Sequence, residues 1–367
     1  MIFQEKQATE VTSIGPLQPH FFKRIVFSIA LLAVCLTSDL ATAQVGGTQV
    51  FSSLSIPASA RESALGGAML AMKDGDLNLC IRNPSLLDSA VAGKVTFGYI
   101  DYFAKTNAGV FAYARTISPK LTAAASIQFL SHGQLDETDE LGNVIGQFGA
   151  SDFSAGIGLG YRVDSLFSLG GSVKMVYSSL ANYYAAGLLF DLSATYQHPG
   201  QNFSASLVLN NIGFILDPYI EGQKSELPVN LAIGIVKRLP HAPLRFNLVV
   251  DHLESWQVSY EDETQILLDP VSGTVVEQGG PQFGDRLMRH VKLGAEILFS
   301  QNFHFRLGYD YRRRKELGVD NKLGMAGFSY GFGFKLSRFQ LSYGRAIYHL
   351  AGPSNHFSVS TNIFSTR

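Results

Sequence analysis

The feature that most constrains this chain is an alternation of apolar with small or polar residues, which recurs from about residue 94 onward. In "SDFSAGIGLGYRV" (residues 151–163), aromatic and aliphatic side chains occupy one parity, while Ser, Gly and Arg dominate the other. Successive side chains of a β-strand point to opposite faces, so a period of two predicts strands. The alternation predicts fourteen strands, at residues 94–104, 107–117, 120–131, 151–163, 166–180, 183–197, 202–213, 229–239, 243–255, 289–300, 302–313, 322–336, 338–348 and 355–364.

The composition of the two strand faces indicates where such strands fold. The chain has 36 Gly, 26 Phe and 15 Tyr, and only 16% of its residues are charged. A soluble β-sandwich is the alternative, but its outer face would be richer in Lys and Glu. Strands that are apolar outside and polar inside are typical of outer-membrane barrels, which use an even number of strands. We therefore predict an all-β fold, a transmembrane outer-membrane β-barrel of about fourteen antiparallel strands with a short helical N-terminal plug.

The lengths of the connections predict an orientation. The long connections, at residues 132–150, 214–228 and 256–288, are the third, seventh and ninth, whereas the even-numbered ones are short. Outer-membrane barrels have short periplasmic turns and longer outer loops. This asymmetry predicts that the long connections face outward and that both termini lie in the periplasm.

The N-terminal region has the pattern of a signal peptide. Lys23 and Arg24 precede an apolar run at residues 25–36, and Ala41-Thr42-Ala43 offers a cleavage site. A membrane anchor is the alternative, but the run is shorter than the roughly 18–20 residues that a helical span needs. We predict a signal peptide at 1–43, a plug at 44–93 and the barrel at 94–367. After cleavage Cys80 is the only cysteine, so the mature chain can form no internal disulfide.

The segment before the first strand contains short apolar stretches that are too few for a soluble domain. Gly66 and Gly67 allow the backbone to turn or pack closely, and Pro84 holds Asn83 extended. Arg61 is expected to bind carboxylates or carbonyls in the lumen. These five residues are the candidate plug and lumen residues, and an ordinary linker is the alternative interpretation.

A search for catalytic motifs gives no candidate. "GIGLGY" (residues 156–161) lacks the strand-to-helix context of a dinucleotide loop, and "DETDELGN" (residues 136–143) lacks calcium-loop spacing. The nine His form no H-x-x-x-H pair, so we expect no metal site. Because no catalytic or cofactor motif is found, we also expect no cofactor and no enzymatic activity. A net charge of −1 gives no attraction for nucleic acid. "YRRRK" (residues 311–315) is either an interfacial anchor or a contact with lipopolysaccharide phosphates.

Several blocks resemble a known family. Residues 56–57, 59–61, 65–67 and 83–87 resemble the N-terminal segment of FadL-like outer-membrane barrels of the PorV/PorQ group, which belong to the type IX secretion system of Bacteroidota. Blocks at 113–115, 136–152, 164–183, 209–213 and 241–246 are more similar to PorQ than to PorV. Residues 80–82 (Cys-Ile-Arg) depart from the pattern of this superfamily, which often has an aromatic or small residue before the position of Asn83.

This resemblance implies a non-enzymatic role. A PorQ-like barrel would hold a PorZ-like surface protein beside the PorU–PorV attachment complex, which removes sorting domains and links cargo to anionic lipopolysaccharide. The partner would bind the outer loops, with candidate contact residues Asp136, Asp139, Tyr219, Trp256 and Tyr260. The alternative is a FadL-like transporter of hydrophobic small molecules such as long-chain fatty acids, with residues 59–90 as a gated hatch. An open general porin would have no plug.

Overall fold

We analysed a computed structural model of the chain. It describes residues 49–102, 104–222, 225–256, 258, 267–268, 275–276, 283–317, 324–349 and 352–363, all within one compact unit, Gly46–Arg367. The predicted signal peptide at 1–43 and the candidate residue Tyr260 lie outside the described residues.

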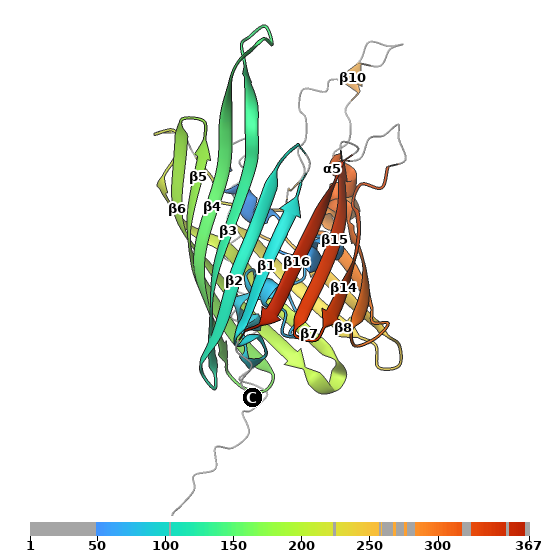
Figure 1. Ribbon diagram of the computed structural model, residues 1–367. Helices are drawn as coiled ribbons and strands as arrows, with labels where there is room; N and C mark the ends of the chain where they lie inside the picture. The colour runs from blue at the N-terminus through green and yellow to red at the C-terminus, as the bar shows by residue number, and fades with distance from the viewer. Residues whose placement is uncertain are drawn as a thin grey trace, which may run out of the picture. The chain divides into compact units, whose positions relative to one another are not determined.

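Fourteen antiparallel strands close into a barrel (Figure 1). Closure occurs where the first strand pairs with the last, with Lys94 opposite Asn362 and Asp101 opposite Asn355. A closed sheet has no free edge and satisfies its backbone hydrogen bonds within the wall. The predicted fold class is confirmed. The barrel strands are β1 (Lys94–Asp101), β2 (Asn107–Ser118), β3 (Leu121–Thr138), β4 (Val144–Arg162), β5 (Phe167–Leu180), β6 (Tyr183–His198), β7 (Phe203–Asp217), β8 (Asn230–Arg238), β9 (Leu244–Val250), β12 (Val291–Ile297), β13 (Phe303–Asp310), β14 (Phe328–Leu336), β15 (Phe339–His349) and β16 (Gly352–Asn362).

The alternation separates the two faces of the wall. On β4, Phe153, Ile157 and Leu159 are 46%, 57% and 45% exposed, whereas Ser154 is buried. The same pattern recurs around the barrel, for example at Phe246 and Phe357. An apolar surface of this extent is unstable in water and stable in hydrocarbon. The sandwich alternative is therefore excluded, and the strands form a membrane-spanning wall.

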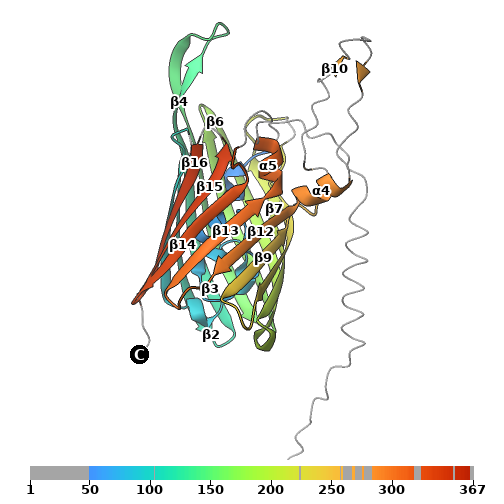
Figure 2. The ribbon, with the colours of Figure 1, turned by 90° about the vertical axis from the view of Figure 1, so that its right-hand side faces the viewer.

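Several predicted boundaries were wrong, including the end of β9 and the start of β14, and two of the differences change the loop regions. Residues 132–150 were expected to form a loop, but β3 and β4 continue through most of this stretch as a hairpin, because the alternation persists and the chain turns tightly at Asp139. Residues 311–313 were expected to end a strand, but Tyr311–Leu317 form helix α5 (Figure 2). α5 is joined to helix α4 (Phe283–Arg289) by a hydrogen bond of 2.7 Å from the Tyr311 hydroxyl to Asp285.

Within the described ranges, no helix is both long enough and apolar enough to cross a membrane. Apart from the barrel, β10 (Leu267–Leu268) and β11 (Val275–Val276) form a separate two-stranded sheet.

We call the barrel end with the β3–β4 hairpin, the β7–β8 connection and α5 the loop end, and the opposite one the turn end. Gln49 forms a bridge with Glu226 in the β7–β8 connection, and the Val50 amide donates to the Glu226 carbonyl at 3.0 Å. β16 ends at Asn362, at the turn end. The two described chain ends therefore lie at opposite barrel ends. The N-terminal segment thus runs lengthwise through the lumen. The prediction that both termini lie in the periplasm concerns residues before Gln49 and after Ile363, which lie outside the described residues, so it stays a prediction.

The exposed apolar face gives a stability prediction. Ile157→Arg, near the middle of the lipid-facing wall of β4, should lower the free energy of unfolding by about 2–4 kcal/mol, because a charge then lies in hydrocarbon. Leu141→Arg is the matched control. Leu141 is 88% exposed at the tip of the hairpin, and the change should stay within about 0.5 kcal/mol. Denaturant titration in phospholipid vesicles measures both, and an equal effect of the two changes would contradict the membrane position of the wall.

Candidate functional site

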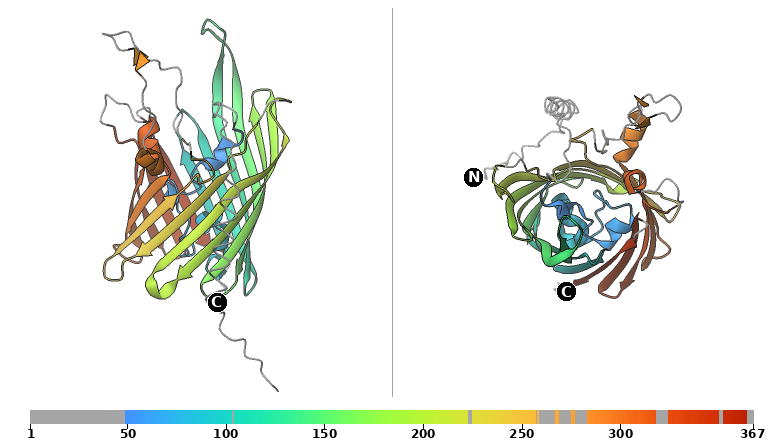
Figure 3. Two further views of the ribbon diagram at one scale, coloured as in Figure 1. Left: turned by 180° about the vertical axis from the view of Figure 1, so that it is seen from behind. Right: turned by 90° about the horizontal axis from the view of Figure 1, so that it is seen from above.

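The N-terminal segment, residues 50–93, fills the lumen as a plug (Figure 3). Four of its five short helical turns begin at side chains that cap backbone amides, namely Ser59, Asp76, Asn83 and Asp88, whereas the first turn, at Ser52–Ser55, has no side-chain cap. Such residues are favoured at helix starts because their oxygens satisfy unpaired N–H groups. The turns are η1 (Ser52–Ser55), α2 (Ala60–Ala64), α3 (Leu77–Cys80), η2 (Pro84–Leu86) and η3 (Ser89–Val91).

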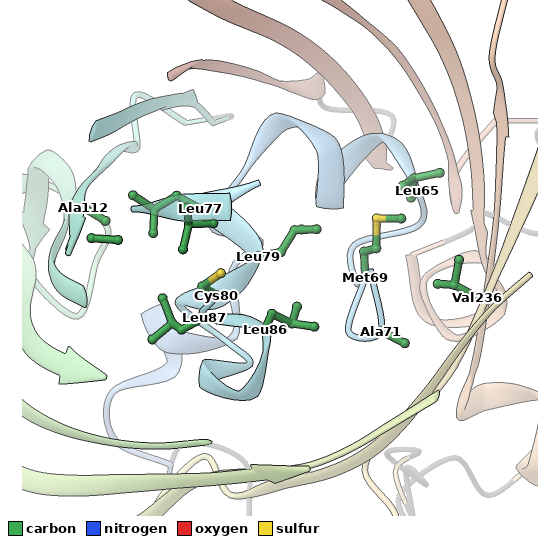
Figure 4. Close-up of a cluster of buried hydrophobic side chains, with 12 residues drawn as sticks. Leu65, Met69, Ala71, Leu77, Leu79, Cys80, Leu86, Leu87, Ala112 and Val236 are labelled. Carbon is green, nitrogen blue, oxygen red and sulfur yellow. The ribbon is translucent and has the colours of Figure 1, made fainter. Parts of the chain in front are cut away.

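The plug has a small apolar core that is completed by the wall (Figure 4). Leu77, Leu79 and Cys80 of α3 are buried with other plug residues. From the wall, Ala112 and Val236 belong to the same cluster. The apolar stretches of the plug are too few to form a soluble domain. They are buried against the barrel wall instead, and this burial stabilises the plug inside the lumen.

Wall glycines let the plug backbone approach closely. A Cβ added at Gly170 would lie 2.1 Å from the Ser85 amide nitrogen, and one at Gly308 would lie 2.1 Å from the Gly66 amide nitrogen. At Gly344 it would lie 2.2 Å from the Ala60 carbonyl oxygen. Real Cβ atoms do not tolerate such distances to backbone, so only glycine fits. We call Gly170, Gly308 and Gly344 the contact glycines.

A buried charged network, the arginine cluster, joins plug and wall. Arg61 of α2 donates from Nε to Glu296 of β12 at 2.9 Å and from Nη2 to Asp74 at 2.8 Å. Glu296 also accepts from Arg245 of β9 at 2.8 Å and from Arg306 of β13 at 2.9 Å. Arg61 and Glu296 are only 2% and 1% exposed.

The charges of the arginine cluster balance within the protein. Asp76 is the remaining carboxylate near Arg61, at 3.3 Å from its Nη1, so three arginines face three carboxylates: Glu296, Asp74 and Asp76. A buried ion pair is costly to form but also costly to break, at about 3–5 kcal/mol when one partner is removed. The cluster therefore fixes the position of α2 in the lumen rather than adding much net stability.

A second polar contact lies at the turn end. The Ser85 amide donates to the Ser193 hydroxyl at 2.9 Å, and the hydroxyls of Ser85 and Thr195 lie 2.6 Å apart. Asn83 caps η2 and donates to the Leu70 carbonyl at 2.6 Å. Pro84 occupies the first position of η2.

The structure places all five candidate plug residues inside the barrel. Arg61 binds wall and plug carboxylates, and Asn83 and Pro84 start η2. Gly66 and Gly67 have φ values of +89° and +93°, a region that favours glycine. The Gly66 amide donates to Ser329 of β14 at 3.0 Å.

Sequence reasoning missed the wall residues of the arginine cluster. Glu296, Arg245 and Arg306 each occur on the otherwise small and polar parity of a predicted strand. A charged residue on this lumen-facing parity is costly unless it is paired. Three such residues on neighbouring strands were thus an available signal for a charged contact with the plug.

The candidate residues of the outer loops come from separate connections. In the β3–β4 hairpin, Asp136 accepts from Gln147 at 2.9 Å, and Asp139 accepts from two turn amides. Tyr219 turns inward, where its hydroxyl bonds Ser178 of β5.

Trp256 lies at the loop end and is half exposed. Its ring stacks on buried His290, with centroids 5.5 Å apart, and it contacts Phe283 of α4 at the same centroid distance. Trp256 therefore belongs to an apolar contact at the start of α4 rather than to a free loop.

Small pockets lie between plug and wall. One is lined by plug residues Leu54, Ile56 and Pro57 and by wall residues including Ile100 and Leu130, and it has a volume of about 20 Å³. A second pocket of about 20 Å³ has Arg82, Lys174 and Asn210 in its lining. Each volume is close to that of one water molecule. In neither place does the seated plug leave room for a larger ligand.

The described residues contain no group of three or more His, Cys, Asp or Glu arranged to hold a metal ion.

Comparison with solved structures agrees with this architecture. The toluene transporter TbuX of Ralstonia pickettii matches with a TM-score of 0.53 and 12% identity, over 83% of this chain and 98% of that chain. A deltaS2S3 mutant of the monoaromatic hydrocarbon channel TodX matches with a TM-score of 0.51 and 12% identity, over 83% and 99%. The monoaromatic hydrocarbon channel CymD matches with a TM-score of 0.50 and 12% identity, over 85% and 99%.

At this identity the likeness shows the fold alone, a β-barrel shared with these transporters and channels. No family model matches the chain. No curated protein sequence matches it either.

The contact glycines give a prediction with a neighbouring control. Gly170→Ala should unseat η2, because its Cβ would overlap the Ser85 backbone, whereas a Cβ at Gly171 meets its nearest atom at an ordinary 3.6 Å. Buried Cys80, the only cysteine among the described residues, reports the opening. We expect maleimide labelling of Cys80 to be about tenfold or more faster in Gly170→Ala and unchanged in Gly171→Ala. Equal rates in both variants would contradict the contact.

Glu62 gives a pH prediction. Its carboxylate is fully buried and accepts from the Ala58 amide at 2.9 Å, and burial raises its pKa to about 7, although Arg82 opposes the shift. A raised carboxyl pKa stabilises the seated plug at low pH, and this contribution is lost as the pH rises through about 7.

The plug of the wild type should therefore open more readily at pH 8 than at pH 5. Glu62→Gln, which cannot ionise at this position, should lack this pH dependence. The ratio of Cys80 labelling rates, wild type over Glu62→Gln, removes the intrinsic pH dependence of the thiol. We expect this ratio to rise more than about tenfold between the two pH values, and a constant ratio would show that seating the plug does not raise the pKa of Glu62.

Proposed function

We propose that this chain is a non-enzymatic outer-membrane barrel that holds a surface partner through its loop end. The observation that carries the proposal is the closed lumen, in which the plug contacts wall glycines through its backbone and Arg61 is buried among carboxylates. A barrel closed in this way presents a rigid loop end, not an open passage.

The apolar wall supports the location. Its lipid-facing aromatic and aliphatic side chains match the belt of an outer-membrane barrel. In this proposal the loop end faces the exterior, as long connections do in such barrels. The hairpin at residues 133–149, together with Trp256 and α4, would then be available to a partner.

The sequence resemblance makes the proposal more specific. A PorQ-like barrel would anchor a PorZ-like surface protein and work beside the PorU–PorV attachment complex, which links cargo to lipopolysaccharide. The PorQ-like blocks that support this include residues 136–152, which form most of the β3–β4 hairpin. The same hairpin thus carries both the resemblance and the most projecting outer surface.

Transport of small hydrophobic molecules is the second candidate function. The structural neighbours support it more directly than anchoring, because TbuX is a toluene transporter and TodX and CymD are monoaromatic hydrocarbon channels. For transport, the plug would have to leave the arginine cluster or the contact glycines in each cycle.

A reversible lock distinguishes the two functions. The adjacent hydroxyls of Ser85 and Thr195 mark positions for Ser85→Cys and Thr195→Cys in a Cys80→Ser background, and oxidation then ties the plug to β6. If the barrel is an anchor, the oxidised variant should retain the same surface protein in pull-downs from native outer membranes as its reduced form.

If the barrel is a transporter, the lock should abolish uptake of toluene or long-chain fatty acid in a deficient host, and reduction should restore it. Uptake that depends on the unlocked plug, with no surface protein recovered, would overturn the anchoring proposal.

A further inference from the structure

The β3–β4 hairpin continues past the barrel wall with two unpaired edges. Pairing of β2 with β3 ends at Asn107 and Ser131, and pairing of β4 with β5 ends at Ala150 and Leu180. Beyond these points, β3 and β4 pair only with each other, and no other described strand adjoins residues 134–138 or 144–148. We call residues 133–149 the rim hairpin, which projects beyond the neighbouring strands in Figures 1 and 2.

The rim hairpin is preorganised. Its register shifts between Ser131 and Gln134, where Gly133 has a φ of +70°, and such a bulge turns a strand pair out of a wall. At the tip, one Asp139 oxygen accepts from the amides of Leu141 at 2.9 Å and Asn143 at 2.8 Å. A free two-stranded hairpin is marginal in water, but this one extends strands that the barrel already holds.

We propose that the rim hairpin is a strand-addition site for an extended, cationic segment of another protein. Unpaired strand edges offer a row of N–H and C=O groups, which is the template that an added strand uses. This inference rests on the proposed anchoring function and names the chemistry of the partner.

The charge of the rim hairpin selects the occupant. Residues 133–149 contain four carboxylates, at Asp136, Glu137, Asp139 and Glu140, and no Lys, Arg or His. A second copy of this chain would bring two such sets together, so like charges oppose self-pairing. A strand with Lys or Arg at alternate positions is complementary.

The two faces of the rim hairpin define the pattern of the added strand. Leu135 lies opposite Phe148, and both are half-buried, whereas Asp136 lies opposite Gln147 on the other face. Glu137 shares the face of Leu135, so each face of the hairpin carries a carboxylate. Because strand side chains alternate between faces, a partner that alternates apolar and basic residues presents its basic residues to Asp136 or to Glu137. Leu141 and Ile145 add exposed apolar surface near the tip.

Hydrogen exchange of the full chain in detergent micelles tests the proposal. The probe is an eight-residue peptide of alternating Lys and Val, compared with a Glu-Val peptide and with the Lys-Val peptide N-methylated at every residue. Only the unmodified Lys-Val peptide should slow exchange of amides within residues 134–138 or 144–148, by about tenfold or more. No protection, or equal protection by all three peptides, would overturn the strand-addition site.

Two charge variants provide the matched control. Asp136→Lys combined with Glu137→Lys should weaken binding of the Lys-Val peptide about tenfold. Asp217→Lys combined with Glu221→Lys, the same change of charge at exposed positions at the end of β7 and in the β7–β8 connection, should not. Equal loss in both would show that the peptide responds to overall charge, which contradicts a specific site.

The same variants in native outer membranes separate this inference from the proposed function. A surface protein that the wild type retains and the variant with Asp136→Lys and Glu137→Lys loses supports both. Retention by both leaves the anchoring function and overturns the role of the rim hairpin, while no retained surface protein in the wild type overturns anchoring itself.

Discussion

Closure of the sheet between β1 and β16 is the constraint on which the rest of the structure depends. In hydrocarbon an unpaired backbone group costs several kcal/mol, so the wall must pair every strand on both sides. A ring of fourteen strands encloses more space than its own inward side chains fill. In this chain several of those side chains are absent altogether, because glycine alternates along the lumen face of β4 (Gly156, Gly158 and Gly160) and of β14 (Gly331 and Gly333). The barrel is therefore completed by residues 50–93, and the plug is as much part of the fold as any strand.

The plug is held by two kinds of contact with different physical consequences. Backbone against glycine, as at Gly170 and Gly308, is a steric match that tolerates almost no added atom. The arginine cluster is an electrostatic match, in which charges from α2, β9, β12 and β13 are satisfied only together. The glycine contacts fix where the plug lies. The arginine cluster makes removal of the plug costly, because removal would leave buried charges without partners. Glu62 adds a pH-sensitive element beside this network.

The sequence supports the fold far better than the site. Period-two alternation defines the number of barrel strands, because lipid outside and a polar lumen inside impose opposite requirements on neighbouring residues. It does not show where a strand pair leaves the wall, so the extension of β3 and β4 through residues 134–148 was missed, as was the helical turn at Tyr311. Arg61 could be singled out from one sequence, but its partner Glu296 lies 235 residues away and depends on the barrel register. The course of the plug through the lumen was likewise invisible to local patterns, although Gly66 and Gly67 indicated that the segment turns or packs closely.

Both candidate functions depend on one quantity, the free energy needed to unseat the plug. An anchor gains rigidity from a high value, because forces on the rim hairpin pass through β3 and β4 into a wall that the plug supports. A transporter needs a value that a ligand can offset, and small apolar molecules cannot compensate the buried charges around Arg61 when these lose their partners. Transport through this fold would therefore require an opening that leaves the arginine cluster intact, such as at the apolar pocket between residues 54–58 and β1–β4. The position of the charged contacts thus limits which part of the plug can move, whichever function the barrel performs.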